Sequence, residues 1–315
     1  MTGATGFVGG HLLTALRSQG HEVVAVVRNP DADLDAELVR GDVTSRDSLV
    51  HAFEGVDGVF HVAGWYKIGD DHPEDGWAVN VQGTRNVMDA AVEAGVPRVV
   101  YTSTVAINSD THGEVLDETY EFTGRHLSVY DQTKAEAHKV AASYADRLDV
   151  VTVMPGGIYG PGDTSTIGEL IEQTALGGRA LAPSGLRMCE AHVDDIAAGH
   201  ILGMDKGRRG QSYMLAGPQT SVVDLLRLVA EIAGGKGPIV LPDVLVGMSA
   251  RTMSVLQRGL PVPPTYRAET LRASRASYLG NPAKAERELG WHARDLREGI
   301  TQTVEWIKAH AQTKT

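Results

Sequence analysis

The sequence predicts an α/β fold in which a doubly wound parallel sheet is followed by a smaller, mainly helical region. Three observations support this prediction. Glycines at positions 3, 6 and 9 are followed at once by an amphipathic segment, residues 12–19. Short apolar runs then alternate with segments of helical spacing as far as residue 154. From about Pro161 this rhythm changes to helices separated by short strands.

The glycine turn suits a dinucleotide pyrophosphate held at the N-terminus of a helix. Gly3 would allow the tight turn, and Gly6 would allow the backbone to approach the phosphate closely. Gly9 would let the new helix lie against the sheet. The candidate cofactor contacts in this turn are Gly3, Thr5, Gly6, Phe7, Val8 and Gly9.

The first strand of such a fold normally precedes the glycine turn and is central in the sheet, with a neighbour on each side. Here the sequence opens directly into the turn. Loss of the strand would leave two strand edges unpaired. We therefore expect that the native chain starts upstream, and that Met1 stands where a hydrophobic strand-end residue such as valine would stand.

The next apolar run, residues 22–27, predicts a strand that ends in Arg28, about twenty residues beyond the turn, where such folds contact the cofactor's ribose. NAD specificity favours a carboxylate at this position, whereas an arginine can pair with a 2′-phosphate. We therefore expect NADP(H), with NAD(H) possible. The alternative is a solvated surface arginine.

Two further strands are expected before residue 65. Residues 37–40 run into Asp42 and Val43, and the Asp42 carboxylate could bond the adenine amine or cap a helix over residues 45–53. Both interpretations stay open. The buried run 58–64 ends in Val62, Ala63 and Gly64, and small residues at a strand's carboxyl end leave room for a cofactor lying across the sheet.

The pattern continues with a helix over residues 80–94 and a strand over 98–104 that ends in the hydroxyl residues Thr102, Ser103 and Thr104. A sixth strand, 150–154, is closed by Pro155 and Gly156. Residues 1–160 are therefore expected to form the cofactor-binding domain, and 161–315 the substrate-binding region.

In the second region the spacing predicts helices over 167–176 and 193–204 and strands over 188–192 and 211–215, with 188–216 returning to the first domain. Residues 242–278 are apolar and punctuated by prolines, and would form either a substrate wall or a small domain's core. Two amphipathic helices, 281–290 and 296–310, follow, with Trp291 and Trp306 expected to pack inward.

Tyr130 and Lys134 open a segment of helical spacing, residues 129–144, and lie four apart on one helical face. A nearby ammonium favours a phenolate, so we expect Lys134 to lower the pKa of Tyr130 from about 10 toward working pH. The phenol could then give or take a proton while a hydride moves at carbon. The same lysine could bond the nicotinamide ribose.

Composition limits the classes of partner. Hydrophobic residues make up 42% and charged residues 22%, which is ordinary for a soluble globular protein. The net charge of −11 argues against nucleic acid as a partner. No apolar run approaches the roughly twenty residues of a membrane span. Cys189 is the single cysteine and the twelve histidines show no ligand spacing, so we expect no disulfide, no metal and a cytoplasmic location.

Taken together, these motifs resemble the extended short-chain dehydrogenase/reductases, the NAD(P)-dependent epimerase/dehydratase group with its Rossmann fold. The resemblance runs nearly end to end. It rests on residues 2–9, 62–64, 80–84, 102–104, 130–134, 159–162, 192–195 and 281–291.

The resemblance implies roles for particular residues. Tyr130 would be the acid/base and Lys134 its activator. Thr104 would supply the hydroxyl that orients the substrate oxygen, with Ser103 as the alternative because many relatives carry serine at the matching position. Asn80 would support the active-site backbone. The segment from Pro155 through Gly156 to Ile158 would contact the nicotinamide.

Two enzyme functions remain open. The first is an NADPH-dependent reductase of an aldehyde or ketone, similar to the dihydroflavonol reductase branch, which Arg28 and the apolar 242–278 region favour. The second is a nucleotide-sugar epimerase or dehydratase, whose diphosphate would need basic residues such as Arg179 and Arg187. A binding module without activity is a third possibility. The resemblance also implies a homodimer through the helices around 80–94 and 129–144.

Overall fold

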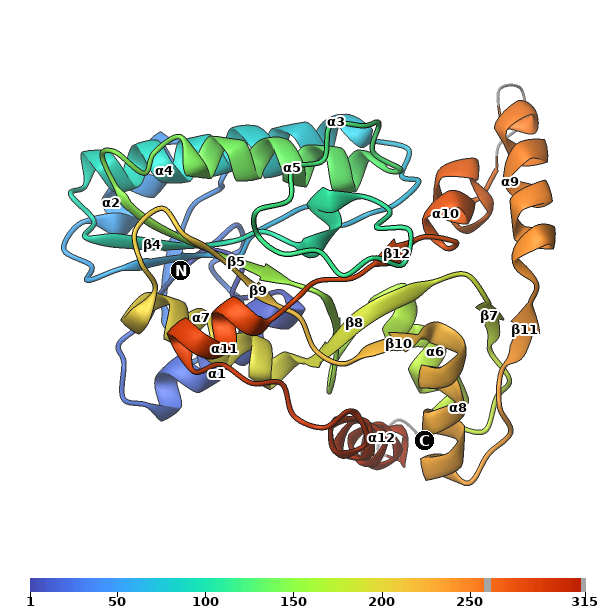
Figure 1. The fold of residues 1–315 in the computed structure, drawn as a ribbon. Coiled ribbons are helices and arrows are strands. Elements are labelled where there is room, and N and C mark those ends of the chain that lie inside the picture. Colours follow the sequence, from blue (N-terminus) through green and yellow to red (C-terminus); the bar gives the residue numbers. More distant parts are fainter. Residues whose placement is uncertain (258–261, 313–315) are drawn as a thin grey trace.

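A computed structural model describes residues 1–257 and 262–312 (Figure 1). Its main sheet is parallel throughout, as the alternation of strands and helices predicted. Four strands lie in the order β3 (Val59–His61), β4 (Arg98–Thr102), β5 (Asp149–Pro155) and β9 (Ser212–Leu215). A second parallel pair is formed by β1 (Val24–Val27) and β2 (Glu37–Arg40). The predicted fold class is confirmed.

Met1 and Thr2 lie between the pair and the four strands. Thr2 forms parallel bridges with both Val26 and His61. The Val26 N–H donates to the Met1 carbonyl at 2.9 Å, and the Thr2 N–H donates to the Phe60 carbonyl at 3.0 Å. The edges of β1 and β3, which we expected to be unpaired, are thus joined over these two residues.

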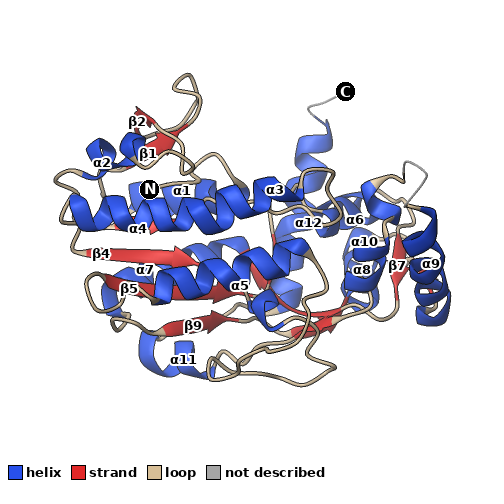
Figure 2. Ribbon diagram, turned by 90° about the horizontal axis from the view of Figure 1, so that it is seen from above, coloured by secondary structure: helices blue, strands red, loops and turns tan. Residues whose placement is uncertain are grey.

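Helices cover both faces of this sheet (Figures 1 and 2). One face carries α2 (Asp47–Phe53), α4 (Gly83–Glu93) and α5 (Val129–Ala142), and the other carries α1 (Phe7–Ser18), α7 (Val193–Lys206) and α11 (Ala283–Leu289). Each face has its own buried apolar cluster. Leu12, Val151 and Ile196 belong to the α1/α7 side, and Val87, Val99 and Val150 to the α4/α5 side. The strand residues alternate between the two clusters as period-two pleating requires.

A second sheet lies beside the carboxyl ends of these strands. Its central strand is β8 (Arg187–His192), which pairs with β6 (Gly157–Tyr159), β10 (Gln219–Ser221) and β12 (Ser277–Tyr278). Around it pack α6 (Thr166–Ala175), α8 (Val222–Ala233) and α12 (Leu296–Gln312). The outer end is formed by the pair β7 (Leu181–Pro183) and β11 (Ile239–Leu241) with α9 (Asp243–Leu256) and α10 (Ala268–Ala273).

Local sequence accounts for where several helices begin. The Ser128 hydroxyl accepts a hydrogen bond from the Asp131 N–H at 3.0 Å and so caps α5. Ser165 and Ser221 cap α6 and α8 in the same way. Because the cap fixes the first turn of α5, it also fixes the direction of the tyrosine and lysine that follow.

Among the described residues, the structure contains no helix with the length and apolar character of a membrane span.

Four details differ from the prediction. The helix expected over 80–94 is divided into a π-helical segment, Trp77–Gln82, and α4. Helix α2 begins at Asp47 with Arg46 in the capping position, so Asp42 does not cap it. Trp306 is 37% exposed and does not pack inward, whereas Trp291 is buried. The apolar stretch from 242 onward is not simply a core, because α9 leaves Val244 70% exposed.

Candidate active site

The glycine turn lies against the end of β3. Gly3 has φ +79°, a conformation that favours glycine, and a Cβ there would come within 2.6 Å of the Ala63 nitrogen. A Cβ at Gly9 would lie 1.9 Å from the Gly3 carbonyl oxygen. Both glycines are therefore required by close backbone approach. The turn brings the start of α1 beside the small residues Ala63 and Gly64.

The N-terminus of α1 is open to an anion. Gly6 occupies the capping position with no side-chain hydrogen bond, and the first turn carries no acidic residue. The first N–H groups of a helix have no partner within the helix and carry partial positive charge. Thr5 beside them is exposed, and Phe7 and Val8 are half-buried. This geometry can accept a pyrophosphate on the N–H groups of the turn.

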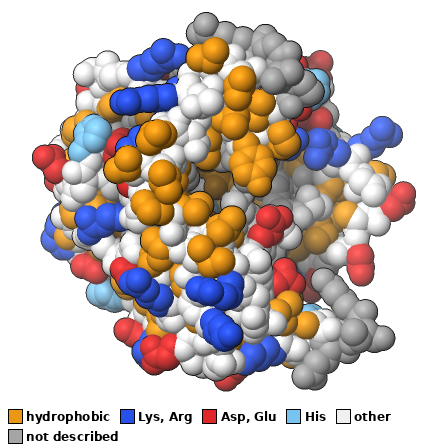
Figure 3. All heavy atoms as spheres, turned by 90° about the vertical axis from the view of Figure 1, so that its right-hand side faces the viewer, with side chains coloured by type: hydrophobic (Ala, Val, Ile, Leu, Met, Phe, Trp, Pro, Cys, Tyr) orange, Lys and Arg blue, Asp and Glu red, His pale blue; other side chains and the backbone are white. Residues whose placement is uncertain are grey.

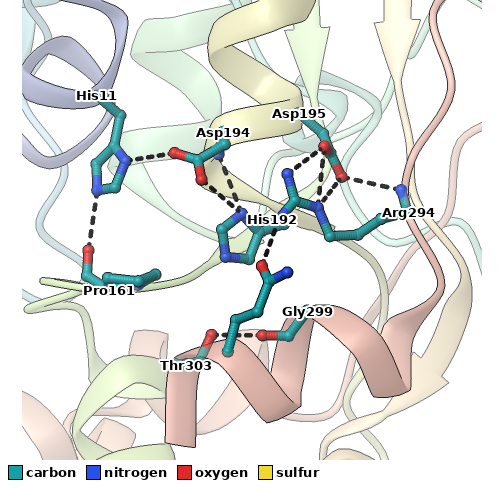
Figure 4. Close-up of polar contacts among 9 residues, drawn as sticks. His11, Pro161, His192, Asp194, Asp195, Arg294, Gly299 and Thr303 are labelled. Atoms are coloured by element: carbon teal, nitrogen blue, oxygen red, sulfur yellow. Dashed lines mark hydrogen bonds and ion pairs between the residues drawn. The ribbon is translucent and has the colours of Figure 1, made fainter. Parts of the chain in front are cut away.

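His11, on the second turn of α1, ties this helix to the second region (Figure 4). Its Nδ1 lies 2.6 Å from an Asp194 carboxylate oxygen, and its Nε2 lies 3.0 Å from the Pro161 carbonyl oxygen. Because both ring nitrogens face acceptors, the pKa of His11 is raised, first by the hydrogen bond with Asp194. The protonated His11 imidazole thus links α1 to the loop after β6 and to the start of α7 through these two contacts.

The neighbouring Asp195 anchors a further segment at the same place. Its carboxylate accepts hydrogen bonds from the Arg294 guanidinium, the shortest at 2.7 Å, and from the Arg294 backbone N–H at 2.9 Å (Figure 4). His192, the last residue of β8, accepts a hydrogen bond from the Asp194 N–H on its Nδ1. Burial lowers the pKa of His192 to about 4, so this ring is neutral.

The ends of β1 and β2 lie at one edge of the sheet because the two strands are parallel, with Val27 opposite Arg40. Arg28 is exposed there, and its side chain has no hydrogen bond or ion pair with any described residue. One Asp42 carboxylate oxygen accepts hydrogen bonds from the N–H and the hydroxyl of Thr44, both at 2.8 Å. The Asp42 carboxylate thus orders its own loop. The Val43 carbonyl is held by Asn86 at 2.8 Å.

Asn80 connects the segment that follows β3 to helix α5, which carries Tyr130 and Lys134. Its Oδ1 accepts from the Trp65 N–H at 2.7 Å. Its Nδ2 donates to the Trp65 carbonyl and to the Thr133 hydroxyl, each at 3.0 Å. The side chain is 2% exposed and sits on the π-helical segment. From its buried position Asn80 therefore holds the active-site backbone at Trp65. The predicted cofactor contacts Val62, Ala63 and Gly64 directly precede Trp65 in the chain.

Tyr130 and Lys134 lie on α5 beside the end of β4. The Lys134 ammonium donates to the Thr102 carbonyl at 2.7 Å and to the Tyr101 hydroxyl at 3.3 Å. The Thr104 side chain lies near enough to the Tyr130 phenol to act on its pKa, while the Thr104 hydroxyl accepts a hydrogen bond from the Ala106 N–H at 3.2 Å. The Ser103 hydroxyl instead faces His138, 2.9 Å from its Nδ1. Of the two predicted hydroxyls, the structure brings Thr104 to the tyrosine and directs Ser103 away.

The expected effect of Lys134 on Tyr130 is wrong for this structure. The pKa of Tyr130 is raised above its ordinary value, first by burial and then by the neighbouring Tyr66. Burial lowers the pKa of Lys134 to about 7. The spacing of four placed both residues on one helical face, but the ammonium points to the end of β4 and does not pair with the phenol.

The segment after β5 packs closely on β8. A Cβ at Gly156 would come within 2.5 Å of the Cys189 sulfur, so the glycine is needed for this contact. The Thr104 hydroxyl reaches the Pro155 carbonyl at 3.4 Å, and Ile158 packs on the α1/α7 cluster. Pro155, Gly156 and Ile158 are thus held at the carboxyl end of the sheet, next to Tyr130.

Sequence reasoning did not single out Tyr66 or Glu190. The Tyr66 ring packs edge-on against that of Tyr130, with 4.8 Å between ring centroids. Its signal was an aromatic pair, Trp65 and Tyr66, directly after a strand that ends in small residues. Glu190 is a buried acid whose neighbours along the strand, Cys189 and Ala191, are apolar. An acidic residue between such neighbours was the available signal.

Comparison with known proteins agrees with this arrangement. The family model described as "NAD dependent epimerase/dehydratase family" matches residues 1–216. A Synechocystis sp. protein named as a dihydroflavonol 4-reductase is 32% identical over 335 residues, covering 100% of this chain and 96% of that protein. A 3 beta-hydroxysteroid dehydrogenase/Delta 5→4-isomerase of Mycobacterium tuberculosis is 32% identical over 323 residues, covering 92% of this chain and 85% of the relative.

Among solved structures, MoeE5 in complex with UDP-glucuronic acid and NAD superposes with a TM-score of 0.79 at 29% identity, covering 98% of each chain. The same family thus contains relatives named for reduction or dehydrogenation and a structure that holds a sugar nucleotide. The chain belongs to the NAD-dependent epimerase/dehydratase family and is an extended short-chain dehydrogenase/reductase, an NAD(P)-dependent oxidoreductase.

Proposed function

We propose that the protein reduces an aldehyde or ketone with NADPH. A bound nicotinamide would supply the hydride. Tyr130 is the proton donor to the substrate oxygen, because its raised pKa keeps the phenol protonated, which is the form that reduction of a carbonyl consumes. Thr104 orients the same oxygen through its hydroxyl. Lys134 holds the end of β4 and is placed to bond the nicotinamide ribose.

The observation that carries the proposal is that the ionisable groups that shift the pKa of Tyr66, on the substrate side, are all carboxyls. Tyr66, which touches Tyr130, is 55% exposed as a residue, yet desolvation at its hydroxyl and then three carboxyl groups, Asp163, Asp131 and Glu190, raise its pKa to about 12. None of these carboxyl groups can pair with the diphosphate of a sugar nucleotide as a cation would. Burial raises the pKa of Glu190 to about 8 and that of Asp131 to about 7, so these two groups are at least partly protonated at neutral pH. The sequence offered two arginines, Arg179 and Arg187, to bind the diphosphate of a sugar nucleotide. Arg179 donates to the Gly237 carbonyl, and Arg187 is exposed.

An apolar surface beside the site favours a hydrophobic carbonyl compound. The outer end of the second region shows many hydrophobic side chains around a hollow (Figure 3). The exposed apolar residues of β7, β11 and α9 are Leu181 53%, Ile239 42%, Val240 39%, Val244 70%, Leu245 56%, Met248 59%, Val255 64% and Leu256 40%. Helix α10 connects this surface to the loop after Tyr66, since Arg267 and Thr270 hydrogen-bond to the Gly69 and Ile68 carbonyls. Several relatives are named for steroid substrates.

NADPH is favoured over NADH by the ends of β1 and β2. Arg28 has no partner among the described residues and can pair with a 2′-phosphate. No carboxylate stands at the end of β1, and the Asp42 carboxylate is engaged by Thr44. We further propose a cytoplasmic homodimer formed through the helices around 80–94 and 129–144. In each subunit, residues 1–160 bind the cofactor and 161–315 bind the substrate, with β9 returning to the main sheet.

The experiment is a spectrophotometric assay of reduced-nicotinamide absorbance with NADPH and with NADH, against apolar ketones, aromatic aldehydes and sugar nucleotides. We expect steady loss of NADPH with an apolar carbonyl compound and much slower loss with NADH. Interconversion of a sugar nucleotide without net loss of NADPH would contradict the proposal and favour the epimerase/dehydratase alternative.

A further inference from the structure

Glu190 is a buried carboxyl group without a partner. The residue is 1% exposed, and neither carboxylate oxygen has a hydrogen-bond partner among the described residues. Burying a carboxyl group without a partner is unfavourable, because its oxygens give up their hydrogen bonds to water and gain none in return. An apolar residue would fill the same space without that cost. The acid is therefore unexplained by packing.

The position of Glu190 is at the cofactor end of the active site. It lies on β8 directly opposite Gly157 of β6. A Cβ at Gly157 would come within 2.4 Å of its Oε2 and 2.9 Å of its Oε1, so both oxygens lie over the backbone of that glycine. Gly157 belongs to the segment from Pro155 to Ile158 expected to contact the nicotinamide. Glu190 is also one of the groups that raise the pKa of Tyr66.

No cation compensates this carboxyl. Among the described residues its one charged neighbour that affects its pKa is Asp163, and together with burial this raises the pKa of Glu190 to about 8. Tyr159, Cys189 and Tyr66, which it influences in turn, are neutral groups. The group is a protonated acid at neutral pH, with one O–H donor and an acceptor oxygen side by side.

We propose that Glu190 binds the carboxamide of the nicotinamide, its hydroxyl donating to the amide oxygen while its other oxygen accepts from the amide nitrogen. A carboxylic acid and a primary carboxamide are complementary in this way, since each offers one donor and one acceptor side by side. This inference rests on the proposed function, which brings a nicotinamide to the site. It gives Glu190 a ligand-binding role that the glycine turn and the Tyr–Lys pair do not supply.

The test is isothermal titration calorimetry of the full chain with three probes. NADP⁺ carries the carboxamide. Its 3-acetylpyridine analogue keeps the cationic ring but replaces the amide nitrogen by a methyl group. 2′-Phospho-ADP-ribose lacks the ring altogether. In the wild type we expect NADP⁺ to bind about tenfold more tightly than the acetylpyridine analogue, as expected for hydrogen bonds of ordinary strength in a buried site.

The variants are Glu190→Leu, which removes the polar atoms, and Glu190→Gln, which keeps a donor and an acceptor. Glu190→Leu should weaken NADP⁺ binding about tenfold, erase the preference over the acetylpyridine analogue and leave 2′-phospho-ADP-ribose unchanged. Glu190→Gln should stay within about threefold of the wild type. Cys189→Ala, on the same strand, is the control and should leave the preference intact.

Several results would overturn the inference. Equal affinity of the wild type for NADP⁺ and its acetylpyridine analogue would do so without any variant, even if Glu190→Leu failed to fold. Equal weakening of all three probes by Glu190→Leu would indicate a structural role only. If 2′-phospho-ADP-ribose itself did not bind the wild type, the dinucleotide site and the proposed function would fail together with this inference.

Discussion

The polar groups on the two sides of the active site differ in how they are held. On the side of the main sheet, Asn80 uses both amide atoms, Lys134 has two partners and Ser103 faces His138. On the side of the second sheet, both oxygens of Glu190, one oxygen of Asp163 and the Nε2 of His192 have no hydrogen-bond partner among the described residues. The named groups of the first side are held by the chain itself, whereas those of the second side have hydrogen-bonding capacity left for a ligand.

The comparison also separates stability from binding. A fully partnered buried group stabilises the fold, and its removal leaves its partners unsatisfied. An unpartnered buried group costs stability and is retained for another reason. Substitutions on the two sides should therefore have opposite effects on unfolding, while both affect function.

The largest effect is expected at the catalytic phenol. Tyr130→Phe removes the proton donor but keeps the ring that packs against Tyr66, so turnover should fall about a thousandfold while the dissociation constant for NADPH stays within about twofold. Steady-state turnover and calorimetric titration with NADPH measure the two quantities. Tyr144→Phe, near the end of the same helix and bonded to Asp89, is the matched control. Unchanged turnover in Tyr130→Phe would remove the tyrosine from the mechanism.

The next largest effect is expected on the side of the main sheet, where the polar groups have hydrogen-bond partners. Asn80→Ala removes three buried hydrogen bonds and leaves the Trp65 N–H and carbonyl without their side-chain partner. We expect the free energy of unfolding to fall by about 2–4 kcal/mol, measured by urea denaturation. Asn281→Ala, whose side chain accepts one hydrogen bond from the Ala283 N–H in an exposed turn, should cost much less. A loss below about 1 kcal/mol at Asn80 would contradict this role of its side chain.

The third effect has the opposite sign and depends on pH. The pKa of Glu190 is about 8 in the folded protein, above its ordinary 4.5, so the folded state binds more protons than the unfolded state between these values. Glu190 therefore makes the protein less stable as pH rises from 5 to 7. The wild type should lose up to about 1.4 kcal/mol per pH unit relative to Glu190→Gln.

Urea unfolding at pH 5, 6 and 7 measures this difference. The comparison with Glu190→Gln cancels the buried histidines, whose lowered pKa values act in the same range. Lys134 does not interfere until pH approaches 7, because it is charged in both states below its pKa of about 7. Parallel curves for the two proteins would show that Glu190 has an ordinary pKa.

The smallest effect concerns Arg28, whose side chain has no partner among the described residues. Arg28→Ala should weaken NADPH about tenfold and leave NADH nearly unchanged, since only the former carries the 2′-phosphate. Fluorescence titration with each dinucleotide measures the ratio. Arg17→Ala is a control, because the Arg17 guanidinium already pairs with Asp35. An equal change for both dinucleotides would return Arg28 to the role of a solvated surface residue.

The sequence was most informative where local spacing determines geometry. The turn at Gly3 and Gly9, the helix that starts after Ser128 and the buried Asn80 follow from residues near one another or from a familiar motif. The direction of the Lys134 side chain could not be predicted, because it depends on the Thr102 carbonyl, which another element brings into reach. The same holds for the raised pKa of Tyr130, which depends on burial and on Tyr66.

The sequence predictions were less accurate where the structure depends on contacts between segments that are distant in the sequence. Residues 80–94 read as one helix, but the first part takes a π-helical form in which Asn80 reaches Trp65 and Thr133. The apolar content of α9 suggested burial, although the helix lies at the outer end of the molecule with one side uncovered. Trp306 followed the same apolar spacing and is partly exposed. Apolar spacing indicates an amphipathic face, not what covers it.

The histidine on α1 has a consequence for the order in which ligands bind. His11 joins the helix that would carry the pyrophosphate to the Pro161 carbonyl (Figure 4). Asp163, two residues later, is one of the carboxyl groups that act on Tyr66. A dinucleotide that fixes α1 also fixes the loop that faces the substrate. We therefore expect compulsory-order kinetics in which the dinucleotide binds first and leaves last. The carbonyl compound then binds beside a loop whose position the dinucleotide has already fixed.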